Sequence, residues 1–339
     1  MPLILPSVTR VEPNYVDPRL ILQINQASGA FETIGEGEPK VRLGDGDLYV
    51  YMKTLELRTK AAAAQAAINQ LPSCELVGAE ISTPTYLLQN RAEYGHHDTA
   101  AGGRWGIDVA KGHSLAMRQG HFQLMRGALL YGMNPQNGEG LLNAPGSTAV
   151  NLPADTNGNT TVSTYDAGQL AQFLLQQILS IKTAMYQLGM PLRVVILGPQ
   201  RILGYMEYVD IVQLVQYQRA GAGSATTKGL IQDIMATNRD EFVWCYDDTL
   251  IGKGSGGLDA IIITIPEIDV PDVDGISTAP FNRFQPSLES TIEMYMDMAA
   301  PREIPVPIPG GAVDVTAELR ITSGWPIRPE ALIIASMGL

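Results

Sequence analysis

Cysteine is nearly absent from this 339-residue chain, and its two cysteines, Cys74 and Cys245, stand far apart with no CxxC pair. The sequence therefore predicts neither a disulfide framework nor a cysteine-bound metal cluster, and it favours a reducing, cytosolic setting. Long apolar runs are also missing: no stretch of 18 apolar residues occurs, so we expect no membrane-spanning helix. The opening MPLILPSVTR is too short and too interrupted by proline to predict a signal peptide.

Charge is scarce and unevenly distributed. Only 17% of the residues are charged, where about a quarter is usual, and the net charge is -12. Residues 1–130 hold 12 Lys and Arg against 13 Asp and Glu, whereas residues 131–339 hold 11 against 22. A chain with so few charges, 34 Gly and 22 Pro is predicted to cover part of its surface by association. Because phosphate contacts need clustered Lys and Arg, the balance also argues against a tight nucleic-acid binder.

The motifs of common enzymes are missing as well. The chain has no GxSxG or HExxH motif, no GxGxxG motif that leads from a strand into a helix, and no Cys/His pair at a recognisable spacing. The glycine-rich segment 252–257 lacks the Lys-Ser/Thr pair that ends a P-loop. We therefore predict that the chain is not an enzyme and has no catalytic or cofactor-binding residues.

Metal-binding patterns are incomplete. The four histidines lack the tight spacing and the Cys or carboxylate support of a zinc site, so we expect each to be satisfied or exposed: His96, His97, His113 and His121. The acidic series Asp269, Asp272 and Asp274 resembles part of an EF-hand loop, but Phe281 stands where the closing Glu would be. A solvated acidic loop without a metal is predicted there.

The strongest local signal is a long helix at residues 109–133. Its apolar residues recur near helical period, as at Leu115, Phe122 and Leu129. Asp108 suits the N-cap, and Gly132 followed by Asn134-Pro135 ends the run. A loop rich in Asn and Gly follows, and then the segment Gly140-Leu141-Leu142-Asn143.

Basic residues on this helix contrast with the acidic chain around it. Lys111, Arg118 and Arg126 lie between Val109 and Met133, where no acidic residue occurs. One face of the helix is therefore predicted to meet negative charge, most simply the acidic surface of another subunit.

The first 106 residues predict an arm, a hairpin and a connector. Residues 1–40 carry five prolines and one short apolar segment, so they favour an extended arm, with a disordered tail as the alternative. Alternating patterns at 41–58 and 75–88 predict two strands. The Ala-rich segment between them, 59–70, has high helix propensity but almost no large apolar residue. We predict a projecting hairpin, or alternatively a plain surface hairpin, followed by a connector at 89–106.

The middle of the chain predicts a helix and a buried strand. Polar residues 147–165 indicate a surface loop. An amphipathic helix at 166–188, capped by Ser163 or Thr164, precedes a continuous apolar run at 192–197, which is typical of a buried strand. A second helix is expected from residue 202 and a short one at 230–235. The glycines of 252–257 are expected to form a hairpin turn between strands at 242–248 and 260–265.

The C-terminal stretch predicts three strands. The patterns at 291–299 and 313–323 alternate, and 331–334 is a final apolar strand. Between the first two, residues 301–311 read as a Pro-rich turn. Glu318 and Arg320 precede the aromatic Trp325, and Arg328-Pro329 introduces the last strand.

This order of arm, hairpin, long helix with a Gly-Leu-Leu-Asn turn, helix and strand pair, and closing strands resembles tailed-phage major capsid proteins. That family has the fold named after phage Hong Kong 97, which encapsulin shells share. The resemblance implies a mixed α/β (α+β) fold with an N-terminal arm (1–44), an extended loop hairpin (45–90), and a connector with the spine helix (91–145). An axial domain would span 146–285, and the closing strands of the peripheral domain would span 286–339.

The function that the resemblance implies is self-assembly. Copies would tile hexamers and pentamers into an icosahedral virion capsid, assembled in the host cytoplasm, that encloses DNA and contacts it weakly. Separate scaffolding, portal and decoration proteins are possible partners, and no membrane is expected. Five basic residues are candidates for assembly contacts: Lys53, Arg58, Lys60, Arg118 and Arg126. Family members that crosslink themselves use Lys and Asn of neighbouring subunits, but nothing in this sequence marks a catalytic acid, so that activity is not expected here.

Two alternatives stay open. An encapsulin-like cargo compartment would have the same fold, and DNA inside purified particles would distinguish a capsid from it. A soluble α/β enzyme would be indicated by a monomer or dimer with a ligand-binding pocket.

Overall fold

The computed structural model describes residues 28–58, 75–104, 106, 108–155, 158–185, 192–208, 226–267 and 293–339. Its α-helices are α1 (His96–Arg104), α2 (Val109–Tyr131), α3 (Ala167–Ala184), α4 (Gln200–Tyr208) and α5 (Thr227–Thr237). Its strands are β1 (Lys40–Leu43), β2 (Tyr49–Arg58), β3 (Glu75–Gly95), β4 (Thr148–Asn151), β5 (Arg193–Gly198), β6 (Glu241–Tyr246), β7 (Asp259–Thr264), β8 (Met294–Tyr295), β9 (Asp297–Ala299), β10 (Arg302–Ile308), β11 (Ala312–Thr322), β12 (Trp325–Pro326) and β13 (Leu332–Met337).

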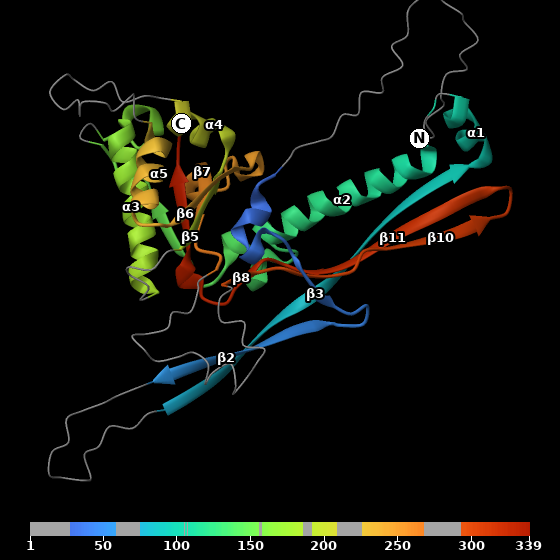
Figure 1. The fold of residues 1–339 in the computed structure, drawn as a ribbon, viewed down its shortest axis with the longest axis horizontal. Helices are drawn as coiled ribbons and strands as arrows, with labels where there is room; N and C mark the ends of the chain where they lie inside the picture. Colours follow the sequence, from blue (N-terminus) through green and yellow to red (C-terminus); the bar gives the residue numbers. More distant parts are fainter. Residues whose placement is uncertain are drawn as a thin grey trace, which may run out of the picture.

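Two large sheets divide the fold into two parts. A five-stranded sheet has the order β4-β13-β7-β5-β6, and α3, α4 and α5 gather around it at the left of Figure 1. A six-stranded sheet has the order β1-β9-β11-β3-β2. Its sixth strand, β10, also pairs with β11, on the edge of β11 that faces away from β3. This second sheet and α2 extend far to the right, and the β2–β3 hairpin projects to the lower left (Figure 1). The mixed α/β class expected from the sequence is confirmed.

The long helix α2 forms where the sequence predicts it. The Asp108 side chain accepts a hydrogen bond from the Lys111 backbone N–H and caps the N-terminus, and Gly132, at φ 74°, ends the helix. The buried face includes Met117, Met125 and Leu129, which lie four or eight residues apart, as helical period requires. This face packs on β3 and β11, so the helix lies along the six-stranded sheet.

His121 lies on the same buried face of α2, one turn from Met117 and one turn from Met125. Its Nε2 has no hydrogen-bond partner among the described residues. The expectation that every histidine is satisfied or exposed is therefore wrong at this position, because the sequence did not show that His121 faces the sheet. Burial among apolar side chains disfavours the charged ring and lowers the pKa of His121 below its ordinary value of 6.5.

A pH dependence follows from that buried ring. The unfolded chain takes up a proton at residue 121 near pH 6.5, whereas the folded chain takes it up only at lower pH, so acid favours unfolding. We expect the free energy of unfolding to fall as the pH drops below 6.5, and a His121→Met variant to lose part of that fall. Urea unfolding of the subunit at a series of pH values measures it. Gln123→Met, at an exposed position of the same helix that holds no titratable group, gives the control and should keep the wild-type pH profile. Identical profiles for all three proteins would contradict the assignment.

The hairpin is confirmed, and its second strand is longer than expected. β2 and β3 pair from Tyr49 opposite Pro84 to Arg58 opposite Glu75. β3 then continues to Gly95, because β11 pairs with it along residues 85–95. The connector predicted at 89–106 is therefore wrong: its first half is strand, and its second half contains α1. The polar sequence there is compatible with a strand because the hydrogen bonds of its backbone go to β11.

The Pro-rich turn expected at 301–311 is also wrong. Residues 302–308 form β10, which pairs antiparallel with β11. Neither Pro305 nor Pro307 has a backbone N–H to donate. Because the two prolines stand two residues apart, both missing donors lie on the same side of the strand. β10 pairs with β11 alone among the described strands, and an edge strand tolerates proline on its open side.

In the five-stranded sheet the strands are confirmed, but their order is not the expected one. β5 is fully or nearly fully buried and lies between β6, which runs parallel to it, and β7, which runs antiparallel. Residues 252–257 are therefore not a hairpin turn. The loop predicted at 147–165 contains β4, and the predicted closing strand β13 pairs with β4 and β7 in this sheet rather than with the six-stranded one.

Several boundaries differ from the prediction. Asp166, not Ser163 or Thr164, caps α3, and it forms a capping box with Gln169. The predicted arm (1–44) is shorter within the described residues, because Ala30 and Ile34 are buried in the core and β1 pairs with β9. Residues 1–27, the Ala-rich segment 59–70 and the acidic series at 269–274 lie outside the described residues.

Candidate functional site

The projecting hairpin has one face that packs against its own subunit and one face that is exposed. Val50 and Met52 lie against a small cluster centred on Tyr295 and Trp325, whose ring centroids are 5.8 Å apart. Because strand side chains alternate, the residues between them point the other way. Tyr49 and Tyr51 are 54% and 61% exposed, and their ring centroids lie 6.2 Å apart. The hairpin therefore presents large aromatic surface to whatever lies outside the subunit.

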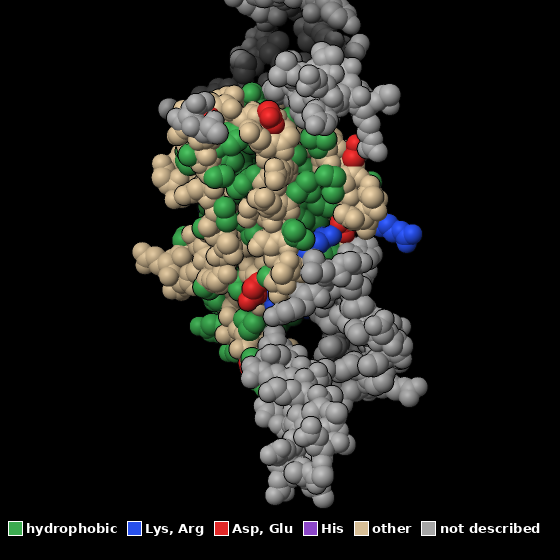
Figure 2. All heavy atoms as spheres, turned by 90° about the vertical axis from the view of Figure 1, so that its left-hand side faces the viewer, with side chains coloured by type: hydrophobic (Ala, Val, Ile, Leu, Met, Phe, Trp, Pro, Cys, Tyr) green, Lys and Arg blue, Asp and Glu red, His purple; other side chains and the backbone are tan. Residues whose placement is uncertain are grey.

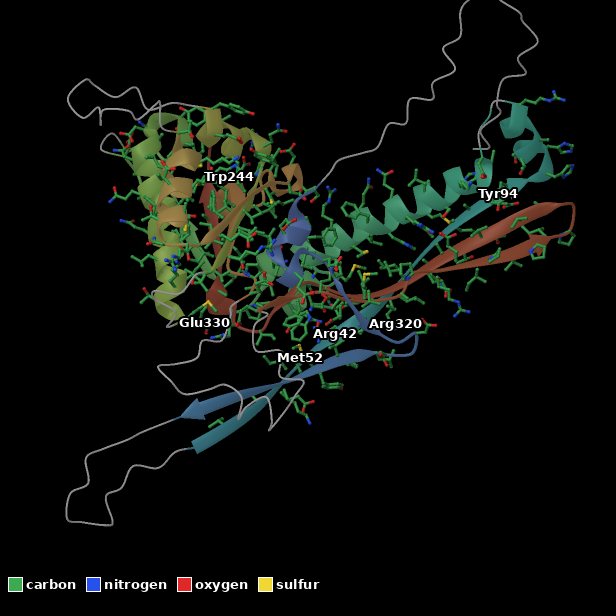
Figure 3. The ribbon with its side chains drawn as sticks, in the orientation of Figure 1. Arg42, Met52, Tyr94, Trp244, Arg320 and Glu330 are labelled. Atoms are coloured by element: carbon green, nitrogen blue, oxygen red, sulfur yellow. The ribbon has the colours of Figure 1, made fainter. Side chains whose placement is uncertain are left out.

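Arg320 holds the base of this hairpin. Its Nη1 donates to the backbone oxygen of Asp47 at 3.0 Å and to the Thr85 hydroxyl at 3.1 Å, which ties the approach to β2 to strand β3. Nearby, Arg42 lies 5.1 Å from the Tyr295 ring centroid and 3.3 Å from the Asp297 carboxylate (Figure 3). In the sequence Arg320 stands out only as part of a motif, whereas the structure places it as the residue that fixes the hairpin to β11.

Lys53 continues the exposed face of the hairpin beyond Tyr51. Its side chain is exposed, and Glu80 stands opposite it in the β2–β3 register. Its predicted role in assembly stays a prediction. The side chain of Arg58 and the whole of Lys60 lie outside the described part of the chain.

The basic residues of α2 find acidic partners within the same chain. Arg118 Nε lies 3.3 Å from a carboxylate oxygen of Glu303 on β10, and the Ser114 hydroxyl donates to that oxygen at 2.8 Å. The Arg118 side chain is nevertheless 72% exposed, so its predicted contact with another subunit stays a prediction. Arg126 is only 12% exposed and lies 3.8 Å from Asp247. The prediction that Arg126 meets the acidic surface of another subunit is corrected: its negative partner is the end of β6 of its own chain.

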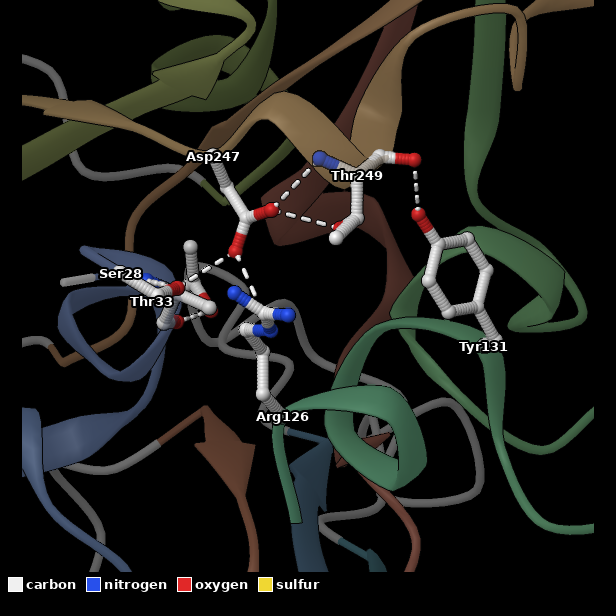
Figure 4. A network of polar contacts seen from close by, with 7 residues as sticks. Ser28, Thr33, Arg126, Tyr131, Asp247 and Thr249 are labelled. Atoms are coloured by element: carbon white, nitrogen blue, oxygen red, sulfur yellow. Dashed lines mark hydrogen bonds and ion pairs between the residues drawn. The ribbon is translucent and has the colours of Figure 1, made fainter. Parts of the chain in front are cut away.

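Asp247 is the centre of a buried polar network (Figure 4). Its side chain has no exposed area. It accepts hydrogen bonds from the Thr249 backbone N–H at 2.9 Å and from the Thr249 and Ser28 hydroxyls, and Arg126 completes its surroundings. Tyr131, at the end of α2, donates its hydroxyl to the Thr249 backbone oxygen at 2.6 Å. The network joins three segments that are distant in sequence: residue 28, the C-terminal half of α2 and the end of β6.

A second buried carboxylate, that of Glu139, lies in the loop after α2 and connects this loop to two strands. It accepts hydrogen bonds from the Tyr86 hydroxyl at 2.7 Å, the Asn134 backbone N–H at 3.0 Å and the Ser323 hydroxyl at 2.8 Å. The hairpin strand β3, the loop after α2 and the end of β11 thus meet at one side chain. Glu139 belongs to no motif in the sequence, although its position one residue before the Gly-Leu-Leu-Asn turn is a usable signal.

Features of other functional classes are limited in the described residues. No three His, Cys, Asp or Glu side chains there come together as metal ligands. A cavity of about 410 Å³ near the tip of β3 is lined mostly by apolar atoms, with Tyr94, His96 and Val313 on its wall. None of the helices that the structure describes is both long enough and apolar enough to cross a membrane.

Comparison with known proteins identifies the fold. No family model and no curated protein matches the chain. Among solved structures, a chain of the capsid of Myoviridae phage XM1 is similar over 96% of this chain and 97% of its own length, with 13% identity and a TM-score of 0.62. The capsid of an empty GTA particle is similar over 96% of both chains (11% identity, TM-score 0.57). A virus-like particle from Pyrococcus furiosus covers 92% of this chain and 94% of its own (11% identity, TM-score 0.50).

The fold is a mixed α/β arrangement of two large sheets, with a long helix that packs along the six-stranded one and a hairpin that projects from it. In particular, the chain has the Hong Kong 97-like fold of tailed-phage capsid proteins, as the order of its sequence elements implied.

Proposed function

We propose that this chain is the major capsid protein of a tailed bacteriophage, and that its work is self-assembly into an icosahedral shell around the DNA genome. The observation that carries the proposal is the end-to-end likeness to a phage capsid chain, which leaves only a few percent of either chain unmatched. The exposed aromatic face of the hairpin supports it, because two adjacent tyrosines exposed by more than half are costly to leave in water on a monomer. The proposal includes a non-enzymatic role, with hexamers and pentamers of this chain in a virion.

Shell assembly from such a subunit would depend on many modest contacts. A subunit with a net charge of -12 repels its copies at long range, so association requires apolar or hydrogen-bonded faces that meet at short range. The hairpin supplies one such face, and its Tyr295–Trp325 anchor keeps it in a fixed direction. Scaffolding, portal and decoration proteins belong to the proposal as possible partners.

The proposal predicts large closed particles from this chain alone. We expect the purified wild-type chain, when concentrated, to give icosahedral particles by negative-stain electron microscopy. A Tyr49→Ser/Tyr51→Ser double variant should form at least tenfold fewer particles. Because both rings are exposed in the subunit, its thermal unfolding should stay close to that of the wild type.

A wild-type chain that stays a monomer or dimer at every concentration would contradict the capsid proposal and favour the enzyme alternative. The encapsulin alternative shares the fold, and a virus-like particle is among the similar structures, so an experiment has to separate the two functions. Particles made in a phage-infected host that protect genome-length DNA from nuclease would decide for a capsid. Particles that hold protein cargo instead would decide against it.

A further inference from the structure

Helices α3 and α5 form an outer face of the five-stranded part that carries almost no charge. The exposed positions of α3 form one stripe with spacings of three and four residues, at Gln169, Gln172, Gln176, Ser180 and Thr183, with Leu179 beside it. None of these side chains is charged. Leu179 is 54% exposed. Exposed helix faces of soluble proteins ordinarily carry charged side chains, as α2 does with Lys111 and Arg118.

The second helix extends the same face. α5 packs beside α3, and Ile234 is exposed on it by 42%. Asp233 is its one exposed charged residue. We call the exposed residues of these two helices the α3–α5 face. Figure 2, which looks at this side of the molecule, shows mainly apolar and uncharged side chains, with acidic and basic groups confined to a few isolated spots.

The face is held rigidly because the two helices are tied together at both ends. The Thr227 hydroxyl donates to the Ala167 backbone oxygen at 3.1 Å where both helices begin. Near their other ends, the Lys182 ammonium group is paired with the buried carboxylate of Asp240. The lysine of α3 is therefore turned to a partner inside the subunit and leaves the outer stripe neutral.

We propose that the α3–α5 face is an interface between two copies of this chain in the same shell. This inference rests on the proposed function and names the partner of one further surface of the subunit. The partner follows from charge. An acidic partner would be selected by basic side chains and a basic one by acidic side chains, and this face offers only Asp233. A copy of the chain carries the same excess of acid, so a neutral face lets two copies meet without the repulsion of like charges.

The hydrogen-bonding groups of the α3–α5 face and its area both suit a second copy of the chain as the partner. Glutamine side chains both donate and accept hydrogen bonds, so they satisfy the backbone and side-chain groups of a neighbour without burying a charge. With 18 residues in α3 and 11 in α5, the helices are about 27 and 16 Å long and present roughly 400 Å² between them. That is about half of the ~800 Å² per partner of a typical stable interface, which suits one of several contacts that a shell subunit shares.

The test adds like charge to the face. In a Gln172→Glu/Gln176→Glu variant, each copy gains two negative charges at nearly unchanged side-chain shape. We expect the fraction of chain that sediments as shells at 0.1 M salt to fall at least tenfold. It should recover substantially at 1 M salt, because the screening length shortens from about 10 to about 3 Å. Circular dichroism and thermal unfolding should stay near wild type, and the salt recovery is a response that a folding defect would not give.

The control is a Gln123→Glu/Gln136→Glu variant, which places the same two charges at exposed positions outside the α3–α5 face. It should assemble like the wild type. If the wild type forms shells and the Gln172→Glu/Gln176→Glu variant forms them equally well, or if both variants fail alike, the interface is wrong while the capsid proposal stands. If the wild type forms no shells, the capsid proposal itself fails. Should the double variant not fold, Gln176→Glu alone carries the same test.

Discussion

Replacing Asp247 by alanine should lower the free energy of unfolding of the subunit by about 3 kcal/mol or more, the range found when one partner of a buried ion pair is removed. The carboxylate has no exposed area and accepts hydrogen bonds from two groups of Thr249 and from the Ser28 hydroxyl. Its loss would leave those donors without their acceptor and would deprive the 12%-exposed Arg126 of this negative charge. Urea unfolding of dissociated subunits at neutral pH measures the effect.

The adjacent residue provides a matched control for Asp247→Ala. Asp248 is exposed and accepts a hydrogen bond from the Gln200 backbone N–H at 2.8 Å, at the start of α4. Asp248→Ala should cost only about 1 kcal/mol, as for the loss of a helix cap. Asp247→Asn should fall between the two, because the amide keeps one acceptor but not the charge. Equal losses for Asp247→Ala and Asp248→Ala would show that the buried network contributes no more than an exposed cap.

The Asp247 network also bears on shell formation. It connects α2, which lies along the six-stranded sheet, to the end of β6 in the five-stranded sheet. The two exposed faces proposed for assembly lie in different parts of the fold. The tyrosines are on the hairpin of the six-stranded sheet, and the glutamine stripe is on α3, beside the five-stranded sheet. Their relative direction therefore depends on the joint between the two parts. A subunit with a loosened joint would have both faces intact and still present them at wrong angles to its neighbours.

Elements with strong local signals were predictable from the sequence. α2 was found with its cap at Asp108 and its end at Gly132, because apolar period, capping carboxylate and glycine are all encoded within the helix itself. The two hairpin strands were found for the same reason, since alternation is a local pattern. The order of these elements also carried the resemblance that led to the Hong Kong 97-like fold, which the comparisons confirm.

Features that depend on long-range pairing were not predictable. Arg126 reads as a surface residue in sequence because its partner, Asp247, lies more than a hundred positions away. The prolines at 305 and 307 read as a turn until β11 is seen to pair with that segment. β6 and β7 read as a hairpin because periodicity identifies strands but says nothing of which strand inserts between them. The neutral stripe on α3 was visible in the sequence, but its exposure was not.

Gly140 is a position where a single added methyl group should be strongly destabilising. Its backbone, at φ 85° and ψ 149°, lies in a region that only glycine occupies readily. A Cβ built there would lie 2.2 Å from the Gly132 backbone nitrogen and 2.4 Å from the Tyr131 carbonyl carbon. These atoms belong to the end of α2. They cannot move away from an added Cβ, because the backbone of Gly132 itself lies close to the backbone of Glu139. Both the conformation and the close approach therefore require glycine.

We expect Gly140→Ala to lower the free energy of unfolding by at least about 3 kcal/mol, because about 1–3 kcal/mol of backbone strain adds to displacement of the α2 terminus. In a protein of ordinary stability this would leave little folded, assembly-competent subunit. Gly112→Ala is the matched control: Gly112 is an exposed residue within α2, and an added Cβ meets nothing within 4 Å. There the same change should stabilise by up to about 1 kcal/mol through helix propensity. The two variants, compared by thermal unfolding and by yield of shells, should move in opposite directions. A Gly140→Ala chain as stable as the wild type would mean that the contact between the end of α2 and the Gly-Leu-Leu-Asn turn does not hold this joint together.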